Sequence, residues 1–235
     1  MPSSSPTGNP DEPPAPPGIG FVGAGIRPPF PVRGAILAGG SATRLQGIPK
    51  GLEIVGGRRI LDRVIDALRS ALGHDPVLIA NDPGAGNWSP GLAVIADREP
   101  GAGPLGGIAT ALEAAAGPVL CVAWDMPFLE AGLLREIAGR LTDADASIPE
   151  SEGPRGLEPL AAAYAPSALP PIRLALAAGR RSAVSFHPGV RLARVPLAVV
   201  RSFGDPARLF FNVNTAADLA RARRWAASPS PDPAG

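Results

Sequence analysis

The sequence predicts an α/β protein with a Rossmann-like, mostly parallel sheet that helices cover on both faces. Three observations favour this fold class: short apolar runs recur along the chain, helical patterns of about a dozen residues separate them, and glycines or carboxylates follow them directly. Alternating strands and helices are typical of βαβ units, whose parallel sheets are buried on both sides. Ligands of such sheets gather outside the carboxyl ends of the strands, so we expect the function there.

The first half of the chain contains the regular elements. Short apolar runs predict strands at 35–37, 77–80, 92–96 and 119–123. Apolar residues at three- and four-residue spacing predict a helix over 60–72 that ends near Gly73. Small residues after a glycine-rich segment predict a second helix over 108–116. This half therefore accounts for most of the parallel sheet.

The second half is less regular. Its predicted elements are a helix at 133–141, strands at 146–148 and 160–164, a helix at 168–178, a strand at 193–200 and a final helix at 219–225. Pro170 and Pro171 fit the first turn of a helix. Pro196 restricts the strand at 193–200 to an edge of the sheet or splits it. Thr215 and Asp218 resemble a capping pair at the start of the final helix.

Composition limits the classes of function. The chain has 235 residues, 45% of them apolar, and a net charge of +1, which suits one hydrophobic core and argues against a protein that binds nucleic acid. The single cysteine, Cys121, excludes an intramolecular disulfide and is expected in the core. His74 and His187 are too far apart in the sequence to suggest a metal cluster, and we assign neither a catalytic role. A reducing, cytoplasmic location is the expectation.

Proline content divides the chain into regions. The first 32 residues hold 10 of the 30 prolines, so we expect a disordered tail at 1–32, a single domain at 33–226 and a flexible tail at 227–235. No leader-type pattern and no apolar run long enough to cross a bilayer is evident. No membrane partner is therefore expected.

The stretch AILAGGSATRLQGIPKGL, residues 35–52, carries the strongest functional signal. Its glycines and cations are Gly39, Gly40, Gly47, Arg44 and Lys50. Glycines bring backbone N–H groups close to an anion, and two cations neutralise it, so the loop suits phosphate. Among 22 basic residues Lys50 is the one lysine, and its flexible ammonium can follow a phosphate that changes geometry. The pattern is neither a P-loop nor G-x-G-x-x-G, and the plain alternative is that Gly39 and Gly40 merely end a strand.

Two carboxylates come directly after predicted strands. Asp125 follows the run at 119–123, opposite the phosphate loop, where Mg²⁺ would take one or two carboxylates plus phosphate oxygens. Asp97 follows the run at 92–96. Both also suit an ordinary turn. Arg180 and Arg181 form either a solvated pair or an anion site for a second substrate, and the residues alone leave this open.

At this point the residues resemble a known family. The segment LAGGSATRLQGIPKG is similar to the signature of the MobA-like nucleotidyltransferases, a family that includes the molybdenum cofactor guanylyltransferases. The resemblance continues through VIADREPGAGPLGG, VAWDMPFL and FNVNTAADL and covers nearly all of residues 34–225. Leu45, Gln46 and Pro49 depart from the signature. These departures leave the phosphate-binding residues in place.

The resemblance implies a Rossmann-like fold, Mg²⁺ as the metal, and transfer of GMP from GTP to the terminal phosphate of molybdopterin. The implied catalytic residues are Lys50 and Asp125, and Asp125 is also the implied metal ligand. Arg44, from the same loop as Lys50, is expected to assist in catalysis. The implied nucleotide-binding residues are Leu37, Ala38, Gly39, Gly40, Lys50, Asn81, Asp97, Gly103, Gly107 and Asp125. Arg181, Asn212 and Asn214 are expected to serve the second substrate. Proteins that insert molybdenum or accept the cofactor are further expected partners.

Three alternatives stay open at this point. A related enzyme of the same fold would transfer CMP to molybdopterin, or a nucleotide to a sugar phosphate or cobinamide phosphate. A catalytically silent nucleotide-binding module is the second alternative. A dinucleotide-dependent oxidoreductase is the third, and it would need the glycine fingerprint that this loop lacks.

Overall fold

The computed structural model describes residues 31–39, 44–45 and 47–228. The tails predicted at 1–32 and 227–235 fall outside these residues apart from 31–32 and 227–228. Within the described part, no helix combines the length and the apolar character that a membrane crossing requires.

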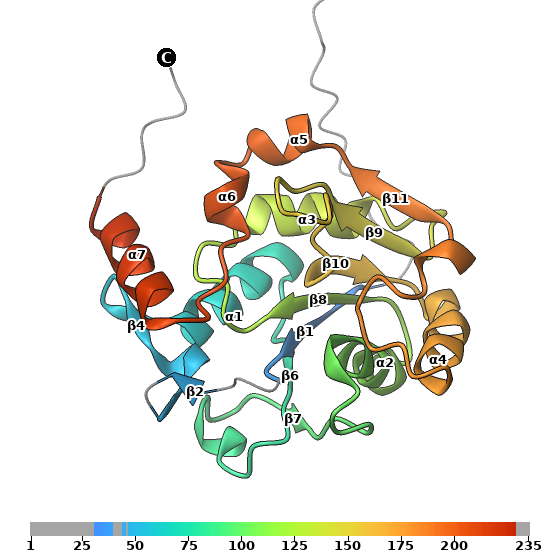
Figure 1. The fold of residues 1–235 in the computed structure, drawn as a ribbon, viewed down its shortest axis with the longest axis horizontal. Coiled ribbons are helices and arrows are strands. Elements are labelled where there is room, and N and C mark those ends of the chain that lie inside the picture. Colours follow the sequence, from blue (N-terminus) through green and yellow to red (C-terminus); the bar gives the residue numbers. More distant parts are fainter. Residues whose placement is uncertain (1–30, 40–43, 46, 229–235) are drawn as a thin grey trace, which may run out of the picture.

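A seven-stranded sheet forms the centre of the molecule, as predicted (Figure 1). Its order is β11 (Leu192–Val195), β9 (Ala146–Pro149), β10 (Ala161–Tyr164), β8 (Val119–Ala123), β1 (Arg33–Leu37), β6 (Val77–Ile79) and β7 (Val94–Ile95). All neighbours are parallel except β10, which is antiparallel to both β8 and β9. The strand β1 lies between β6 and β8, so its carboxyl end is central.

Helices cover both faces of the sheet, which confirms the predicted fold class. They are α1 (Ile60–Leu72), α2 (Gly103–Ala115), α3 (Ala131–Gly139), α4 (Leu169–Ala177), α5 (Leu197–Arg201), α6 (Pro206–Leu209) and α7 (Ala216–Ala227). Figure 1 shows α1 and α3 on one face and α2 and α4 on the other. Successive residues of a strand point to opposite faces. Accordingly Ile36 packs in the core with α1, while Ala35 and Leu37 pack in the core with α2.

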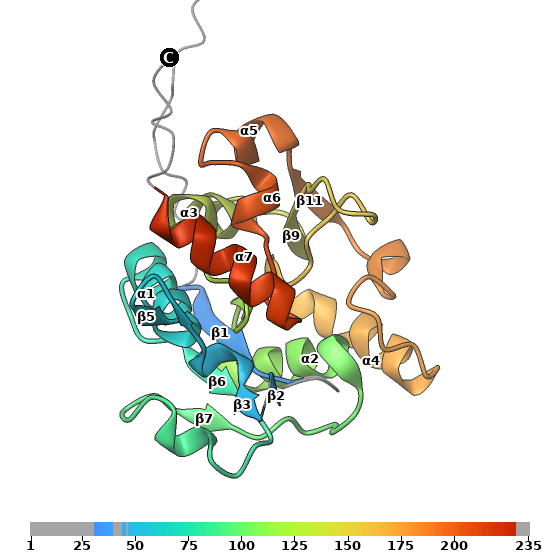
Figure 2. The ribbon, with the colours of Figure 1, turned by 60° about the vertical axis from the view of Figure 1, so that its left-hand side comes forward.

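Small elements follow the end of β1. The hairpin of β2 (Arg44–Leu45) and β3 (Ile48–Pro49) leads into a 3-10 turn, η1 (Lys50–Leu52), and then into the hairpin of β4 (Ile54–Val55) and β5 (Arg58–Arg59). Further 3-10 turns are η2 (Ala85–Asn87), η3 (Pro166–Ala168) and η4 (His187–Gly189). Figure 2 shows β2 and β3 beside the end of β1.

Two predicted elements need correction. The strand predicted at 193–200 ends at Val195, at the edge of the sheet, and residues 197–201 form α5 instead. Pro196 splits the segment as expected, but its fixed φ also suits the residue just before a helix. The helix predicted at 108–116 begins five residues earlier, at Gly103. The second glycine-rich segment is therefore mostly helical.

The final helix begins with the predicted cap. The Thr215 hydroxyl accepts the Asp218 N–H at 3.1 Å, and the Asp218 carboxylate accepts the N–H groups of Thr215 and Asn214 at 2.8 and 3.1 Å. This capping box fixes the direction in which the chain enters α7. It thereby also fixes Asn214.

We expect Thr215→Ala to lower the free energy of unfolding by about 1 kcal/mol, because it removes the cap of α7. Urea-induced unfolding measures this loss. Thr142→Ala is the matched control, since the exposed Thr142 hydroxyl donates only to the Gly139 carbonyl beyond a helix end. Its loss should stay within about 0.5 kcal/mol. Equal losses in the two variants would contradict the capping role.

Candidate active site

Three side chains from distant parts of the sequence meet at the carboxyl end of the central strands. Lys50 comes from η1, Asp125 follows β8, and Asn214 precedes α7. The Lys50 ammonium donates to Asn214 Oδ1 at 2.6 Å and lies 4.0 Å from Asp125 Oδ2. The order of the strands explains the meeting, because β1 and β8 are parallel neighbours whose ends share one edge.

Lys50 is unusual in being a buried cation. Its side chain is 5% exposed and that of Asp125 13% exposed. A buried charge is tolerated only when it is paired and hydrogen-bonded. Asp125 and Asn214 meet that condition from one side of the ammonium. This explains why an ammonium is stable in a buried position at the rim of the sheet.

The backbone around Asp125 is held from two directions. The Trp124 N–H donates to the Leu37 carbonyl at 3.3 Å, which joins it to the end of β1. The Val213 N–H donates to the Asp125 carbonyl at 2.9 Å, which brings the segment between α6 and α7 across the end of β8. Asp125 thus connects the phosphate loop with Asn214.

The Asp125 carboxyl group is not fully satisfied by the protein. Its Oδ1 atom is buried and has no hydrogen-bond partner among the described residues. Burial raises the pKa of Asp125 to about 6, although the Lys50 charge opposes the rise. Buried oxygen atoms without a partner are rare and call for a ligand, an ion or a water molecule. The carboxyl group is therefore free to bind a cation.

The chemistry of this group fits Mg²⁺. That ion prefers oxygen ligands and binds to one or two carboxylates together with substrate phosphates. Within the described ranges no group of three or more His, Cys, Asp or Glu side chains could hold a metal. A metal at Asp125 would therefore depend on phosphate oxygens of the substrate, as Mg²⁺ sites of this kind do.

The implied nucleotide residues occupy the ends of β1, β6 and β7. The Ala38 N–H donates to the Ile79 carbonyl at 2.9 Å, and the exposed Gly39 has open space where a Cβ would stand. Gly40 lies outside the described residues. Arg44 is described only through its backbone, which pairs with Pro49 next to Lys50.

Asn81 and Asp97 lie side by side beyond β6 and β7. The Asn81 Oδ1 atom accepts the Asp97 N–H at 2.8 Å. The Asp97 Oδ1 atom accepts the Thr110 hydroxyl at 2.9 Å and the Glu99 N–H at 3.1 Å. One oxygen of Asp97 therefore anchors its loop to α2. The two residues lie next to each other, as a shared nucleotide site requires.

Gly103 and Gly107 were expected on a second glycine loop, and this expectation is wrong, since both belong to α2. A Cβ on Gly107 would stand 3.4 Å from Leu37 Cδ2, which is ordinary van der Waals contact. Gly103 has a φ of +70°, and a Cβ built on it would stand 3.3 Å from the Arg181 carbonyl oxygen. Of the two positions, Gly103 is therefore the one whose backbone conformation favours glycine.

The second-substrate residues separate in the structure. Asn214 meets Lys50, whereas the Asn212 amide donates to the Phe210 carbonyl at 3.0 Å. Arg181 is exposed beside the start of α2. No hydrogen bond within the described part joins Asn212 or Arg181 to Lys50, Asp125 or Asn214.

Sequence reasoning missed Glu158. The segment before β10, which runs antiparallel to β8, brings the Glu158 carboxyl group close enough to Asp125 for the two charges to interact. Burial raises the pKa of Glu158 to about 7, and the Asp125 charge adds to the rise. No sequence signal marked it, because only the antiparallel direction of β10 brings it to this edge.

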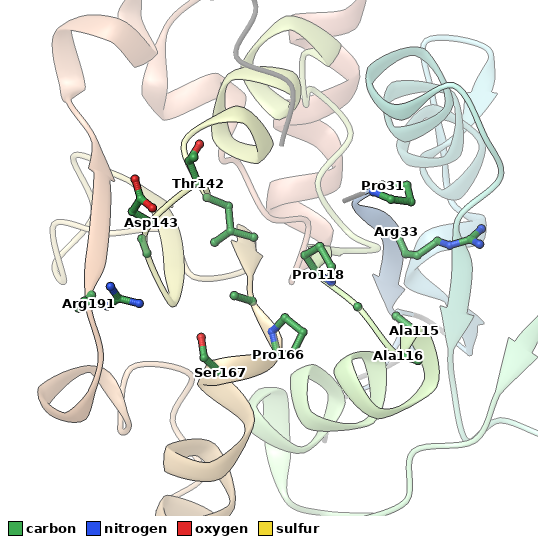
Figure 3. A pocket seen from close by; sticks show the side chains of 14 residues that line it. Pro31, Arg33, Ala115, Ala116, Pro118, Thr142, Asp143, Pro166, Ser167 and Arg191 are labelled. Atoms are coloured by element: carbon green, nitrogen blue, oxygen red, sulfur yellow. The ribbon is translucent and has the colours of Figure 1, made fainter. Parts of the chain in front are cut away.

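A large cavity lies elsewhere. It has a volume of about 520 Å³ and is lined by Arg33, Pro118, Asp143, Ser167 and Arg191 among others (Figure 3). Arg33 begins β1 and Pro118 precedes β8, so the cavity is at the amino ends of these strands. It contains none of the predicted site residues. We place the candidate site at Lys50 and Asp125, where a buried cation and an unpartnered carboxylate oxygen lie together at the carboxyl ends of the strands.

We expect the free energy of unfolding of Asp125→Asn, compared with that of the parent protein, to increase as pH rises. The folded-state pKa of about 6 lies above the ordinary value near 3.9, so ionisation of Asp125 costs folding free energy above pH about 4, fully so above pH about 6. Asparagine avoids this cost, which is about 3 kcal/mol for such a shift. Urea unfolding at pH 4 and pH 8, with a chelator present, measures the difference.

Asp145→Asn provides the contrast. The Ser167 hydroxyl and the Arg191 N–H lower the pKa of Asp145, so its ionised form stabilises the fold. This variant should lose stability at pH 8. A gain for Asp125→Asn that did not grow between pH 4 and pH 8 would contradict the effect of burial.

Comparisons with known proteins identify the family of the chain. The model of the MobA-like NTP transferase domain matches residues 34–194. A molybdenum cofactor guanylyltransferase of Bradyrhizobium sp. (strain ORS 278) is 35% identical over 215 residues, which cover 86% of this chain and 96% of that protein. A molybdenum cofactor guanylyltransferase of Desulfosudis oleivorans is 32% identical over 194 residues, covering 81% and 94% respectively.

Solved structures give the same result. Molybdopterin-guanine dinucleotide biosynthesis protein A from Archaeoglobus fulgidus superposes with a TM-score of 0.71 at 27% identity, covering 83% of this chain and 99% of that one. A 2-C-methyl-D-erythritol 4-phosphate cytidylyltransferase from Thermus thermophilus has a TM-score of 0.62 at 22% identity, covers 85% of this chain and 100% of that one, and shows the fold alone. The family predicted from the four motifs is confirmed: this chain belongs to the MobA-like NTP transferase family of nucleotidyltransferases.

Proposed function

We propose that this protein transfers GMP from GTP to the terminal phosphate of molybdenum-molybdopterin, forming the guanine dinucleotide cofactor and releasing pyrophosphate. The observation that carries the proposal is the meeting of Lys50, Asp125 and Asn214 at one edge of the sheet. The chain has this site on a fold whose relatives at 32 and 35% identity are named molybdenum cofactor guanylyltransferases.

The proposed reaction is an in-line displacement at the α-phosphorus of GTP. A phosphate oxygen of the acceptor forms a new bond to this phosphorus, and the bond to the β-phosphate oxygen breaks with its electron pair on pyrophosphate. A phosphate oxygen that is already ionised needs no general base and no covalent enzyme intermediate. Catalysis then consists of positioning and of electrostatic stabilisation.

Lys50 stabilises negative charge on the triphosphate in this proposal. Its ammonium is preorganised, because Asn214 holds it at 2.6 Å in a site with little water. A neutral amide orients the ammonium without cancelling its charge, so the cation stays available to phosphate. Arg44 and the loop N–H groups are proposed to add to the same charge stabilisation.

Asp125 is the proposed ligand of Mg²⁺. Its buried Oδ1 atom has no partner in the described part of the chain and supplies a hard oxygen donor. When bound, the ion supplies positive charge that polarises the phosphates. Lys50 Nζ lies 4.0 Å from Asp125 Oδ2. With the ion bound at Asp125, the ammonium and the ion would both stabilise the charge of the triphosphate.

The remaining substrate contacts are proposed from position. Asn81 and Asp97 lie together beyond β6 and β7, where the nucleoside of GTP would lie, with Leu37, Ala38, Gly39 and Gly40 next to it. Arg181, Asn212 and Asn214 are proposed on the acceptor side. Proteins that insert molybdenum or receive the cofactor are the proposed macromolecular partners.

We expect GTP with Mg²⁺ to raise the melting temperature more than ATP, CTP or UTP do. A ligand at 100 times its Kd stabilises a protein by about 2.7 kcal/mol, so a preference for one base is measurable by thermal unfolding. A larger shift with CTP would identify a cytidylyl donor instead. Shifts without any Mg²⁺-dependent release of pyrophosphate in the presence of acceptor would identify a silent binding module.

We expect Lys50→Ala and Asp125→Ala each to lower kcat for pyrophosphate release at least about 100-fold, because each removes charge stabilisation of the transition state. Steady-state kinetics measures this, with far-UV circular dichroism as a check on folding. Arg201→Ala is a matched control, since this exposed cation pairs with Glu152 at 2.8 Å on the surface. Turnover near the parent level in either site variant contradicts the proposed function.

A further inference from the structure

A glycine and a tryptophan are in direct contact beneath the charged pair. Gly51 follows Lys50, and a Cβ built on it would stand 2.5 Å from Trp124 Cε3 and 3.1 Å from two further ring atoms. Real Cβ atoms essentially never approach so closely. The Gly51 backbone therefore rests directly on the Trp124 indole, at a position where no side chain fits.

The Trp124 ring is itself held in place. It is 2% exposed and stacks on Trp88, which is 6% exposed, with the ring centroids 5.0 Å apart and the planes at 22°. Trp88 in turn is fixed through its carbonyl, which accepts Arg59 Nη1 at 2.7 Å. Stacked aromatic rings in a close-packed core have little freedom to shift. The surface under Gly51 is therefore rigid.

The contact joins the two neighbours of the charged pair. Gly51 comes directly after Lys50, and Trp124 comes directly before Asp125. The Lys50 and Asp125 side chains lie on separate segments, and no hydrogen bond between described residues joins them to each other. Because Lys50 is bonded directly to Gly51, a movement of Gly51 on the ring would change the position of Lys50 relative to Asp125.

We propose that the contact between Gly51 and Trp124 is a positioning device that sets the separation of Lys50 and Asp125, with Trp88 keeping the Trp124 ring in place. The inference rests on the proposed function, because it concerns the same pair of groups. Gly51, Trp124 and Trp88 are positioning residues: they act through Lys50 and Asp125 and need not touch substrate.

Ordinary core packing is the competing explanation, and the chain contains a control for it. Gly132 in α3 also faces an aromatic ring, and a Cβ built on it would stand 2.9 and 3.0 Å from two atoms of Phe203. Gly132→Ala introduces the same kind of clash at a place that has no role in the site. Both glycine variants should therefore be less stable than the parent protein, and only Gly51→Ala should change how Lys50 and Asp125 are positioned.

The decisive experiment compares Gly51→Ala with Gly132→Ala. We expect both variants to melt at lower temperature than the parent, but only Gly51→Ala to lower kcat, by about 10- to 100-fold, because displacements of about 1 Å in a catalytic site have effects of this size. The rise in melting temperature caused by GTP with Mg²⁺ should shrink in Gly51→Ala and stay unchanged in Gly132→Ala. This second measurement does not depend on turnover.

A double-mutant cycle tests whether Gly51 acts through Lys50. In the Lys50→Ala background, Gly51→Ala should lower the residual kcat no further, while its effect on melting temperature should persist.

If Gly51→Ala does not fold, Trp88→Phe replaces it, since this change weakens the stack without a clash and should lower kcat about threefold or more. The same non-additivity with Lys50→Ala is expected for it.

The outcomes separate the inference from the proposed function. If Gly51→Ala and Gly132→Ala have the same kcat and the same response to GTP, or if the losses of Gly51→Ala and Lys50→Ala simply multiply, the positioning role is wrong. Such a result leaves the proposed function intact as long as Lys50→Ala and Asp125→Ala lose turnover. If those two keep turnover, the proposed function itself is wrong.

Discussion

The buried ion pair between Lys50 and Asp125 is the constraint on which the rest of the site depends. Two charges taken out of water are stable only if their geometry is good and their remaining hydrogen-bonding capacity is used. Here the ammonium donates to Asn214 at 2.6 Å, while one oxygen of Asp125 is left without a partner among the described residues. The pair is thus incomplete as a structural feature. It would be complete with a phosphate beside the ammonium and a cation at the carboxylate.

The fold explains how such an incomplete pair can be held still. The central strands β1 and β8 are buried on both faces. Asp125 lies just beyond the end of β8, and Lys50 follows β1 after the hairpin of β2 and β3. Hydrogen bonds from Trp124 to Leu37 and from Val213 to Asp125 then fix the backbone on either side. A site built in this way stabilises charge without reorganising, which is how electrostatic catalysis gains its efficiency. This arrangement costs stability, because burial raises the pKa of Asp125 and its ionisation therefore lowers the free energy of unfolding.

Much of this could be predicted from the sequence, for identifiable reasons. Apolar runs followed by Gly39 and Asp125 indicate parallel strands whose ends meet, and the single lysine marks the phosphate loop. The direction of β10 could not be predicted, because a short buried run of three alanines and a tyrosine carries no signal for parallel or antiparallel pairing. Glu158 was missed for the same reason. Gly103 and Gly107 were expected on a second glycine loop, and the structure places both in α2. Gly103 begins this helix with a φ of +70°, a conformation that glycine adopts without strain.

The hydrogen bond between Lys50 and Asn214 spans 164 residues of sequence. During synthesis, which proceeds from the amino terminus, the β1 loop and β8 emerge well before the segment that carries Asn214. Contacts between residues so far apart also form late when an isolated chain folds, since a long loop must close first. A partly made chain can therefore pair its strands while its Lys50 still lacks an amide partner. The hydrogen bond that orients Lys50 for a triphosphate can thus form only once the segment before the last helix has been made. A polypeptide that ends before Asn214 would lack it.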